Sequence, residues 1–162
     1  IRSMGSGNIG TTNALRNFGK TAGLLTFILD ALKGAVATYI GGKIAGENGM
    51  YLAMFFVVIG HMYSFLLNFK AGKGIATVFG ALIYIKPLFA LCMFAVFFVV
   101  VLLSRMVSLG SISVCLVAIC ASFYKYGFNY FSLSLSIIAM IIVVKHKDNI
   151  KRIIEGKENK LF

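Results

Sequence analysis

A run of glycines, hydroxyl groups and amides near the start of the chain has the composition of an anion-binding loop. It covers residues 5–16, with the letters GSGNIGTTNALR. Glycines let backbone N–H groups turn toward an anion, Ser, Thr and Asn add neutral donors, and the planar fork of Arg16 matches a phosphate. The alternative is a flexible loop in which Asn13 or Thr12 caps a helix, because G-x-G-x-x-G alone is a weak pattern.

A second cluster places two lysines among glycines. Residues 60–64 read GHMYS and residues 68–77 read NFKAGKGIAT. Lys70 and Lys73 can neutralise a phosphate above a helix N-terminus, where the helix dipole also favours an anion. The alternative is a basic loop whose lysines meet lipid headgroups, with His61 as a packed, hydrogen-bonded residue.

Two shorter clusters lie further along the chain. Ser104 and Arg105 form either an anion ligand set or an ordinary turn. His146 and Asn149 are three residues apart, so they share a face if the segment is helical, and the alternative is a basic amphipathic tail on anionic lipid.

Asp30 and Lys33 differ from these clusters because they interrupt an apolar run. At a spacing of i and i+3 they can pair, and ionisable residues inside a membrane span indicate either function or a structural ion pair between helices. With two His and no Cys-x-x-Cys motif, the sequence predicts no metal site and no cofactor.

Membrane helices are the elements that must position these groups. The chain has 162 residues, of which 59% are hydrophobic and 13% charged, and its mean hydropathy is +0.90. A soluble domain is about 45–50% apolar and about 25% charged. This composition excludes an ordinary soluble globule, a disordered chain and a disulfide-stapled module. The net charge of +11 would suggest nucleic acid in a soluble protein, but membrane topology explains it here, and we expect no nucleic-acid partner.

The apolar residues form six runs, and the expected fold is therefore all-α, a polytopic transmembrane helix bundle with six spans in a single domain over residues 1–162. The runs are 21–42, 50–67, 74–85, 87–104, 107–123 and 128–144. The run at 74–85 is short, so it is either a half-helix or re-entrant segment, or a segment that extends into its flanks. Pro87 separates it from the next run by disfavouring helix in the preceding residue.

The distribution of positive charge predicts the sidedness of the bundle. If all six runs cross, most of the 16 Lys and Arg lie on one face, in segments 1–20, 68–73, 105–106 and 145–162. The opposite face carries Lys43, Lys86 and Lys125. The positive-inside rule then places the first face, with all four polar clusters outside the spans, in the cytoplasm, so these segments can converge on one site.

Together the clusters resemble the bacterial acyl-phosphate:glycerol-3-phosphate acyltransferase family of the inner membrane. The signatures of that family look like GSGNPGATNxLR, GHxxSxFLxFKGGKGxAT and HxxNIxRL, and they stand here in the same order at 5–16, 60–77 and 146–153. Ile9, Thr11 and Ala71 replace the usual Pro, Ala and Gly. The resemblance covers nearly the whole chain.

The resemblance implies a seven-helix protein whose first span precedes the first signature, so that the N-terminal first helix is missing here. It implies transfer of a fatty acyl group from acyl phosphate to the 1-hydroxyl of glycerol 3-phosphate, giving lysophosphatidic acid and phosphate, the first acylation step of phospholipid synthesis. The partners it implies are these two substrates and membrane lipid. The implied location is the bacterial inner (plasma) membrane, with several spans and an active site facing the cytoplasm.

The resemblance also assigns roles to residues. The implied catalytic groups are Ser6, Arg16, Lys73 and His146. The implied substrate-binding residues are Gly5, Gly7, Asn8, Gly10, Thr12, Asn13, His61, Lys70, Gly72, Gly74, Ser104, Arg105 and Asn149.

Two other functions remain open at the level of sequence. A transporter or channel for a phosphorylated solute would need polar residues at the bilayer midplane and usually a repeat, and here only Asp30 and Lys33 qualify. A non-catalytic lipid-binding membrane protein is the second. Neither His61 nor His146 is followed five positions later by Asp, which argues against acyl-thioester enzymes with a His–Asp base.

Overall fold

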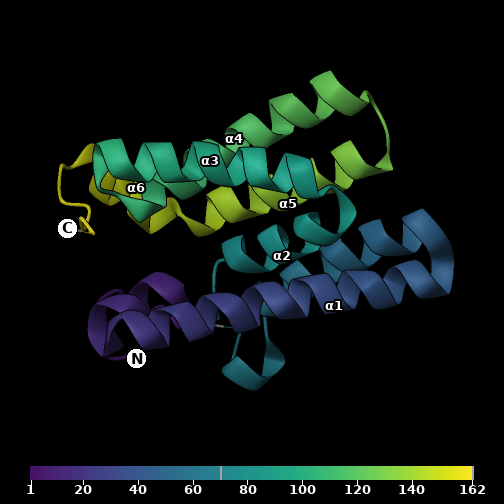
Figure 1. Ribbon diagram of the computed structural model, residues 1–162. Helices are drawn as coiled ribbons and strands as arrows, with labels where there is room; N and C mark the ends of the chain where they lie inside the picture. Colours follow the sequence, from purple (N-terminus) through teal and green to yellow (C-terminus); the bar gives the residue numbers. More distant parts are fainter. Residues whose placement is uncertain (70, 162) are drawn as a thin grey trace. The chain divides into compact units, whose positions relative to one another are not determined.

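The computed structural model describes residues 1–69 and 71–161, and every regular element in these ranges is a helix (Figure 1). The chain divides into two compact units, Ile1–Pro87 and Leu88–Phe162, and each unit is considered separately below. The elements are α1 (Thr11–Met62), η1 (Phe65–Leu67), α2 (Ile75–Ile85), α3 (Pro87–Ser104), α4 (Val107–Tyr126), α5 (Tyr130–Lys145) and α6 (Lys147–Ile154). All six apolar runs are therefore helical, as predicted.

The 52-residue helix α1 is broken twice and contains a helical hairpin. Its backbone leaves the helical region at Gly19, where φ is 86°, and again at Ala45 and Gly46. At the second break the chain reverses, and the first two predicted runs form the two arms (Figure 1). A side chain at Gly41 would overlap the carbonyl of Gly49, and one at Gly49 would overlap the carbonyl of Gly41. Glycine at both positions lets the two backbones touch, as at close crossings of membrane helices.

The short predicted run forms the 11-residue helix α2, which packs against the first arm of α1. A helix of this length is about 16 Å long, whereas the hydrocarbon core of a bilayer is about 30 Å thick. The helix ends at Ile85 with Lys86 as its C-cap, and Pro87 begins α3, so the run does not extend into its C-terminal flank. The structure thus agrees with the half-length alternative.

Unit 2 consists of α3, α4, α5 and α6. One end of it is held by an aromatic cluster in which Phe89, Tyr126 and Phe131 lie 5.3–5.9 Å apart between ring centroids. The side chain of Asn129 accepts a hydrogen bond from the backbone N–H of Ser132 at 3.0 Å and so caps α5. At the other end of α5 the chain bends by 57° into α6, which contacts both α4 and α5.

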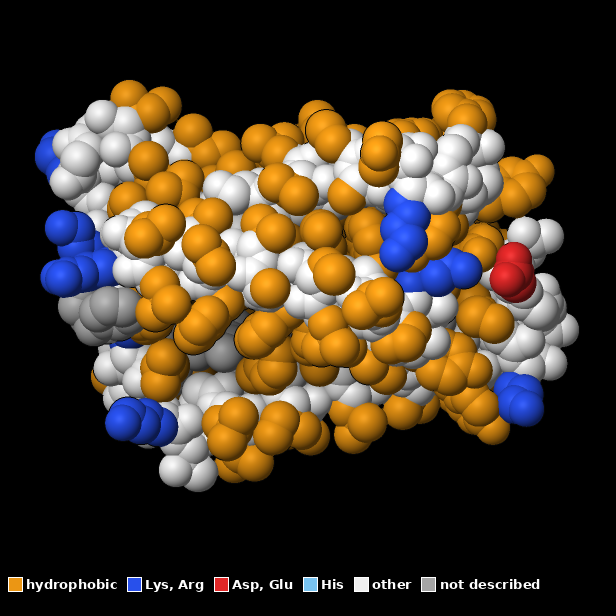
Figure 2. Space-filling model, turned by 45° about the horizontal axis from the view of Figure 1, so that its top comes forward, with side chains coloured by type: hydrophobic (Ala, Val, Ile, Leu, Met, Phe, Trp, Pro, Cys, Tyr) orange, Lys and Arg blue, Asp and Glu red, His pale blue; other side chains and the backbone are white. Residues whose placement is uncertain are grey.

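The outer surfaces of both units are apolar. Among the described residues, α1, α3 and α4 are long and apolar enough to cross a membrane, and α5 with α6 adds a fourth span if the bent pair counts as one. Large apolar side chains such as Leu88 and Leu103 are well exposed, and apolar side chains cover much of the visible surface in Figure 2. Such a surface is suited to lipid tails.

Candidate functional site

The first glycine-rich loop is built around the buried side chain of Asn13. Its Oδ1 accepts a hydrogen bond from the backbone N–H of Ser6 at 3.0 Å, and its Nδ2 donates to the carbonyls of Ile1 and Met4. Gly5 lies directly over this amide with a φ of 57°, where any side chain would overlap Oδ1 of Asn13. Asn13 therefore anchors the loop on α1, and the alternative that it caps the helix is wrong.

The helix cap is provided by backbone groups. Gly10 is the N-cap of α1, so the residue at the cap position has no side chain that could bond to the first turn. The carbonyl of Gly10 accepts from the N–H groups of Asn13 and Ala14, both at 3.1 Å. The next residues, Thr11 and Thr12, open the helix, and Arg16 follows one turn later with an exposed side chain. The loop thus places Arg16 beside the positive end of a helix dipole.

The second basic loop follows the end of α1 at Met62. Asn68 and Phe69 have left-handed backbone conformations with φ of 50° and 59°, which turn the chain after η1. The predicted ligand Lys70 lies outside the described residues. The guanidinium of Arg2 donates to the carbonyl of Leu67 at 3.2 Å. This bond ties the segment just before the first cluster to Leu67, which lies between the two parts of the second cluster, 65 residues along the chain.

Two glycines hold the lysine-bearing part of this loop against the last turns of α1. A side chain at Gly72 would overlap the ring of His61. Gly74 has a φ of 86°, and a Cβ there would lie 2.9 Å from Val58. Lys73 is half-buried between the two glycines and directly precedes Gly74, the N-cap of α2. The structure therefore confirms that Lys73 lies at a helix N-terminus.

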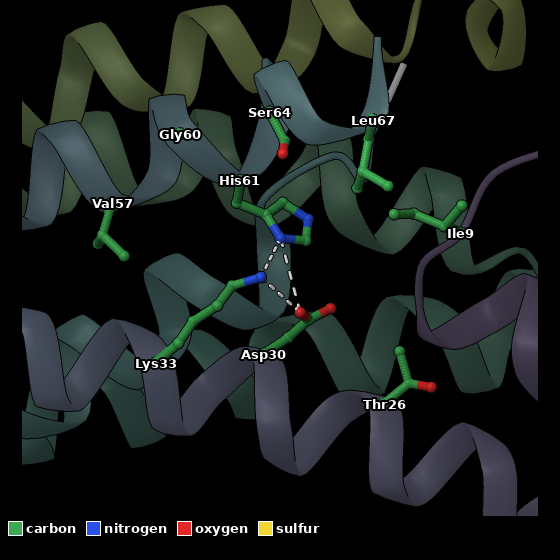
Figure 3. A pocket seen from close by; sticks show the side chains of 9 residues that line it. All are labelled: Ile9, Thr26, Asp30, Lys33, Val57, Gly60, His61, Ser64 and Leu67. Carbon is green, nitrogen blue, oxygen red and sulfur yellow. Dashed lines mark hydrogen bonds and ion pairs between the residues drawn. The ribbon is translucent and has the colours of Figure 1, made fainter. Parts of the chain in front are cut away.

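A hollow of about 360 Å³ opens beside these segments (Figure 3). Its charged wall is formed by three side chains that are in contact, Asp30, Lys33 and His61. The ammonium of Lys33 lies 2.7 Å from the Asp30 carboxylate. The full lining is Ile9, Thr26, Asp30, Lys33, Val57, Gly60, His61, Ser64 and Leu67.

In unit 2, the turn between α3 and α4 carries Ser104 and Arg105. The hydroxyl of Ser104 donates to the carbonyl of Val100 at 2.6 Å and accepts from the N–H of Met106 at 3.1 Å. Arg105 has a left-handed backbone with a φ of 62°, which is uncommon outside glycine and often marks a functional position. Its carbonyl accepts from the N–H of Leu161 at 2.7 Å, so the C-terminal segment returns to this turn.

The predicted pair His146 and Asn149 lies where α5 meets α6, and both residues are buried. The Nδ1 atom of His146 lies 2.8 Å from the carbonyl oxygen of Ile142. A carbonyl can only accept, so Nδ1 carries a proton and Nε2 holds the lone pair when the ring is neutral. The amide of Asn149 donates to Glu158 at 2.7 Å.

Glu158 is a buried carboxylate that the sequence analysis missed. It accepts hydrogen bonds from Ser108 at 2.8 Å, from Asn149 and from Arg152 at 2.7 Å. Burial alone raises the pKa of this carboxyl, but the three hydrogen bonds and the charge of Arg152 outweigh it, so the pKa of Glu158 lies below its usual value. No motif marks this residue, and it is one of three acidic residues in the basic tail, with Asp148 and Glu155, so the sequence did not single it out.

The predicted site residues thus form one group in each unit. The described residues of the first two signatures lie in unit 1, where Ile9 of the first lines the same hollow as Gly60, His61 and Ser64 of the second; Lys70 is not described. In unit 2, the return of the C-terminal segment brings the Ser104–Arg105 turn together with Asn149, next to His146. That both groups serve the same reaction remains a prediction.

The fold and these segments define an all-α integral membrane protein, and comparison with known proteins identifies its family. Residues 1–156 match the family model described as glycerol-3-phosphate acyltransferase. The glycerol-3-phosphate acyltransferases of Carboxydothermus hydrogenoformans and Finegoldia magna are 46% and 43% identical to it, over 99% of this chain and 82% of each relative. The chain belongs to the glycerol-3-phosphate acyltransferase family, which confirms the resemblance.

Two crystal structures extend this comparison. Both are of PlsY (YgiH), an integral membrane glycerol 3-phosphate acyltransferase that is 35% identical to this chain. The glycerol 3-phosphate form matches with a TM-score of 0.93 over 98% of this chain and 80% of that one. The lysophosphatidic acid form matches with a TM-score of 0.90 over 96% and 80%. The predicted class of membrane fold is therefore confirmed.

Proposed function

We propose that this protein transfers a fatty acyl group from acyl phosphate to the 1-hydroxyl of glycerol 3-phosphate, giving lysophosphatidic acid and phosphate. One observation carries this proposal. The chain matches the family model along residues 1–156, and its relatives of known structure are described in forms with glycerol 3-phosphate and with lysophosphatidic acid. These two molecules are the acyl acceptor and the acylated product of that reaction.

The residues of unit 1 supply the cations and hydrogen-bond donors that bind a phosphate. We assign Arg16 and Lys73 as the cationic ligands, because each stands at the N-terminal end of a helix, where backbone N–H groups and the dipole favour an anion. The exposed Ser6 adds a hydroxyl donor on the loop that Asn13 anchors. Gly5, Gly7, Asn8, Gly10 and Thr12 shape or line the loop. Asn13 acts through its bonds to the loop backbone.

Unit 2 supplies a second set of polar groups. We assign Ser104 and Arg105 as phosphate ligands on the turn between α3 and α4, where the left-handed backbone of Arg105 fixes the path of the chain. His146 presents an imidazole whose Nδ1 is already bonded to a carbonyl, so Nε2 is the atom that serves the substrate. Asn149, held by Glu158, completes the set.

The chemistry requires positioning and charge stabilisation more than a nucleophilic side chain. The hydroxyl oxygen attacks the carbonyl carbon of a mixed anhydride, the new ester bond forms, and the bond to phosphate breaks. The phosphate leaves with the electron pair, and in the net reaction it carries the proton of the hydroxyl. Both substrates bring phosphate charge, so fixed cations and N–H dipoles lower the barrier by orienting the reactants and stabilising the developing charge.

The charge pattern of the sequence and the membrane fold support a proposed location. We propose that the protein resides in the bacterial inner membrane among lipids, with both groups of polar residues facing the cytoplasm, because most Lys and Arg fall on that side. The transporter or channel alternative is not favoured, since the family to which the chain belongs is named for an acyltransferase.

The test is an acyl-transfer assay with purified protein in detergent. Acyl phosphate and labelled glycerol 3-phosphate should give lysophosphatidic acid, and an acyl thioester used in place of acyl phosphate should not. Lys73→Ala should reduce the rate, whereas Lys43→Ala, a matched loss of charge outside the predicted site, should not. Absence of product, or equal rates with both donors, would contradict the proposal.

A further inference from the structure

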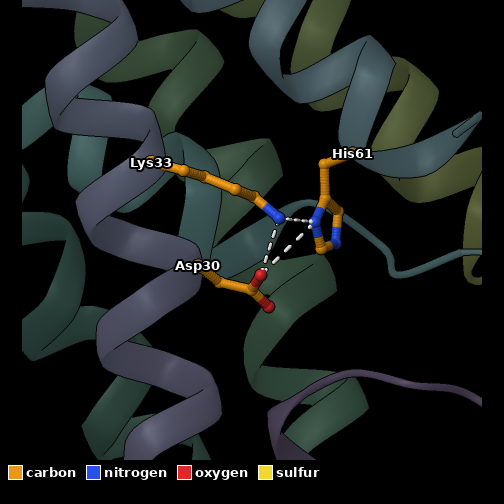
Figure 4. Close-up of polar contacts among 3 residues, drawn as sticks. All are labelled: Asp30, Lys33 and His61. Carbon is orange, nitrogen blue, oxygen red and sulfur yellow. Dashed lines mark hydrogen bonds and ion pairs between the residues drawn. The ribbon is translucent and has the colours of Figure 1, made fainter.

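A polar cluster on the wall of the hollow joins two arms of α1 that lie far apart in sequence (Figure 4). Asp30 and Lys33 are on the first arm, and His61 is in the last turn of the second. The ammonium of Lys33 contacts both the Asp30 carboxylate, at 2.7 Å, and Nδ1 of His61. The side chain of His61 is only 7% exposed, and that of Asp30 is 17% exposed.

The chemistry of the contact fixes the proton on the His61 ring. An ammonium has three donors and no acceptor, so Nδ1 of His61 must accept and therefore has no proton. The geometry agrees with this assignment. Nδ1 of His61 and Oδ1 of Asp30 are 3.5 Å apart, and both atoms contact the ammonium of Lys33. A neutral imidazole that has no proton on Nδ1 carries its proton on Nε2.

This Nε2 edge faces the loop that carries Lys73. The nearest atoms to a Cβ built on Gly72 are Nε2 and its two neighbours in the His61 ring. The backbone at Gly72 therefore lies against the protonated edge of the ring. Because Lys73 is the next residue and Gly74 is packed on Val58, a shift or rotation of the ring displaces the lysine.

We propose that Asp30, Lys33 and His61 form a positioning relay for Lys73. Asp30 holds the ammonium of Lys33, Lys33 fixes the tautomer and orientation of His61, and the ring of His61 sets the position of the loop at Gly72. This inference rests on the proposed function, because it assumes that Lys73 binds a phosphate of the substrates. It makes Asp30 and Lys33 positioning residues and assigns His61 the same role, in place of direct substrate binding.

Acyl-transfer kinetics test the relay with matched variants. Lys33→Met keeps the length of the side chain but removes the donor, and we expect about a 10-fold loss in kcat/KM, the size of one lost charge-assisted hydrogen bond. Lys33→Arg keeps a charged donor and should recover most of that loss. Lys43→Met, also on α1 but beyond the cluster, should leave kcat/KM unchanged. Equal effects of Lys33→Met and Lys33→Arg would overturn the relay.

A double-mutant cycle with Lys73 separates positioning from general destabilisation. If Lys33 acts through Lys73, then adding Lys33→Met to Lys73→Ala should cost less than about 3-fold, because the group being positioned is already gone. Gly72→Ala, which pushes on the His61 ring directly, should reproduce the loss and should also be non-additive with Lys73→Ala. Multiplicative losses in both cycles would show that the cluster acts elsewhere, and the relay would be wrong.

Nitrogen-15 NMR of the imidazole rings gives a readout that does not need catalysis. The chain has two histidines, and the spectrum of wild-type protein should show His61 with an unprotonated Nδ1 and a protonated Nε2. Lys33→Met should change both shifts, and Lys43→Met should not. If the wild-type protein formed no lysophosphatidic acid, the proposed function would be wrong. The spectrum would still show whether His61 accepts a hydrogen bond from Lys33. A proton on Nδ1 in the wild-type protein would overturn the relay.

Discussion

Single buried polar residues determine the geometry of both groups of site residues. Asn13 is 2% exposed and organises the first loop, and Glu158 is 9% exposed and joins α4, α6 and the C-terminal segment. A buried polar group without partners is costly, which is why each of these side chains makes three or more hydrogen bonds. We expect such residues to act on the reaction through the segments that they hold in place.

The carboxylate of Glu158 should make the stability of the protein depend on pH. Its pKa is lowered in the folded state, so its contribution is fully present above the ordinary pKa of a glutamate and is lost as the pH falls through the folded pKa. We expect wild-type protein to lose stability as the pH falls below the ordinary pKa of a glutamate, and Glu158→Gln to be less stable at pH 7 by about 1–3 kcal/mol with a flatter acid profile.

Thermal unfolding in detergent at a series of pH values measures this effect. Glu155→Gln is the matched control, because it removes the same charge from an exposed side chain that pairs with Lys157 at 3.5 Å. An exposed pair of this kind contributes little, so the control should follow the wild-type profile. Identical profiles for both variants would contradict the role assigned to Glu158.

The guanidinium of Arg16 should be needed for its shape as well as its charge. Arg16→Ala removes a charge-assisted contact worth about 1.5–3 kcal/mol, which corresponds to roughly a 10- to 100-fold loss in kcat/KM. Arg16→Lys should remain poor if the fork binds a phosphate through two parallel bonds. Steady-state kinetics on folded, membrane-inserted variants measure both. Full activity of Arg16→Lys would reduce Arg16 to a determinant of topology.

The residue types of the site could be predicted from sequence, but their contacts could not. The spacing of glycines around a cationic residue indicated phosphate binding at Arg16 and Lys73, because each of these residues lies in a short contiguous motif. The contact of Lys33 with His61 spans 28 residues, and that of Ser108 with Glu158 spans 50. Hydropathy and motif spacing describe neighbouring residues in the sequence and do not say which residues of two helices face one another. These pairs can therefore be seen only in the folded chain.

At the scale of the helices, small residues decide how closely the elements pack. A side chain at Gly34 on α1 would overlap the carbonyl of Thr77, and one at Gly80 on α2 would overlap the carbonyl of Ala31. In a membrane, where burial of apolar surface gives little driving force, such close contact supplies dispersion energy between helices. The short helix α2 therefore depends on two glycines for its place against α1.

Gly80→Ala should destabilise the protein although alanine is the better helix former. The added methyl group would meet the backbone of Ala31 with no room to move, and overpacking of this kind costs about 1–3 kcal/mol. Gly60→Ala is the control, because a Cβ at Gly60 meets no atom within 4 Å among the described residues. It should be neutral or stabilising by up to about 1 kcal/mol. Equal melting temperatures for the two variants would refute the close contact.

The sequence predicted the existence of the helices better than their ends. Long apolar runs identify helices of membrane length, and all six runs are helical. The break at Gly19 and the end of α1 at Met62, five residues before the predicted run ends, were missed. A hydropathy run measures where apolar residues stop, whereas helix ends depend on local backbone geometry, such as the non-helical φ of −126° at Tyr63, the C-cap of α1.

At the scale of the whole molecule, charge composition predicts how the reaction handles phosphate. The chain has 16 Lys and Arg but only five Asp and Glu. Within residues 1–69 and 71–161, no group of three or more His, Cys, Asp or Glu side chains gathers as a metal site would require. We therefore expect side-chain cations to neutralise the substrates, with activity unchanged by a chelator. Loss of activity on chelation, restored by Mg²⁺, would contradict this.

The same charges predict the orientation of the protein in the membrane. The prediction depends on whether the short helix α2 crosses the membrane. If α2 crosses, Lys43 and Lys86 share the outer face and Lys160 is cytoplasmic. If α2 does not cross, every later loop changes sides, and Lys160 moves to the face of Lys43. An 11-residue helix needs local thinning of the bilayer or cover from neighbouring segments to cross, so both cases are physically accessible.

Cysteine labelling in oriented membrane vesicles decides between these cases. In a background without Cys92, Cys115 and Cys120, a membrane-impermeant maleimide should label Lys43→Cys and Lys86→Cys from outside and Lys160→Cys only from the cytoplasmic side. Acyl transfer by each variant confirms that the labelled protein is folded. Labelling of Lys160→Cys from the same side as Lys43→Cys would place the predicted groups of site residues on opposite faces. One active site could not then use both, because no soluble phosphate substrate reaches across the hydrocarbon core.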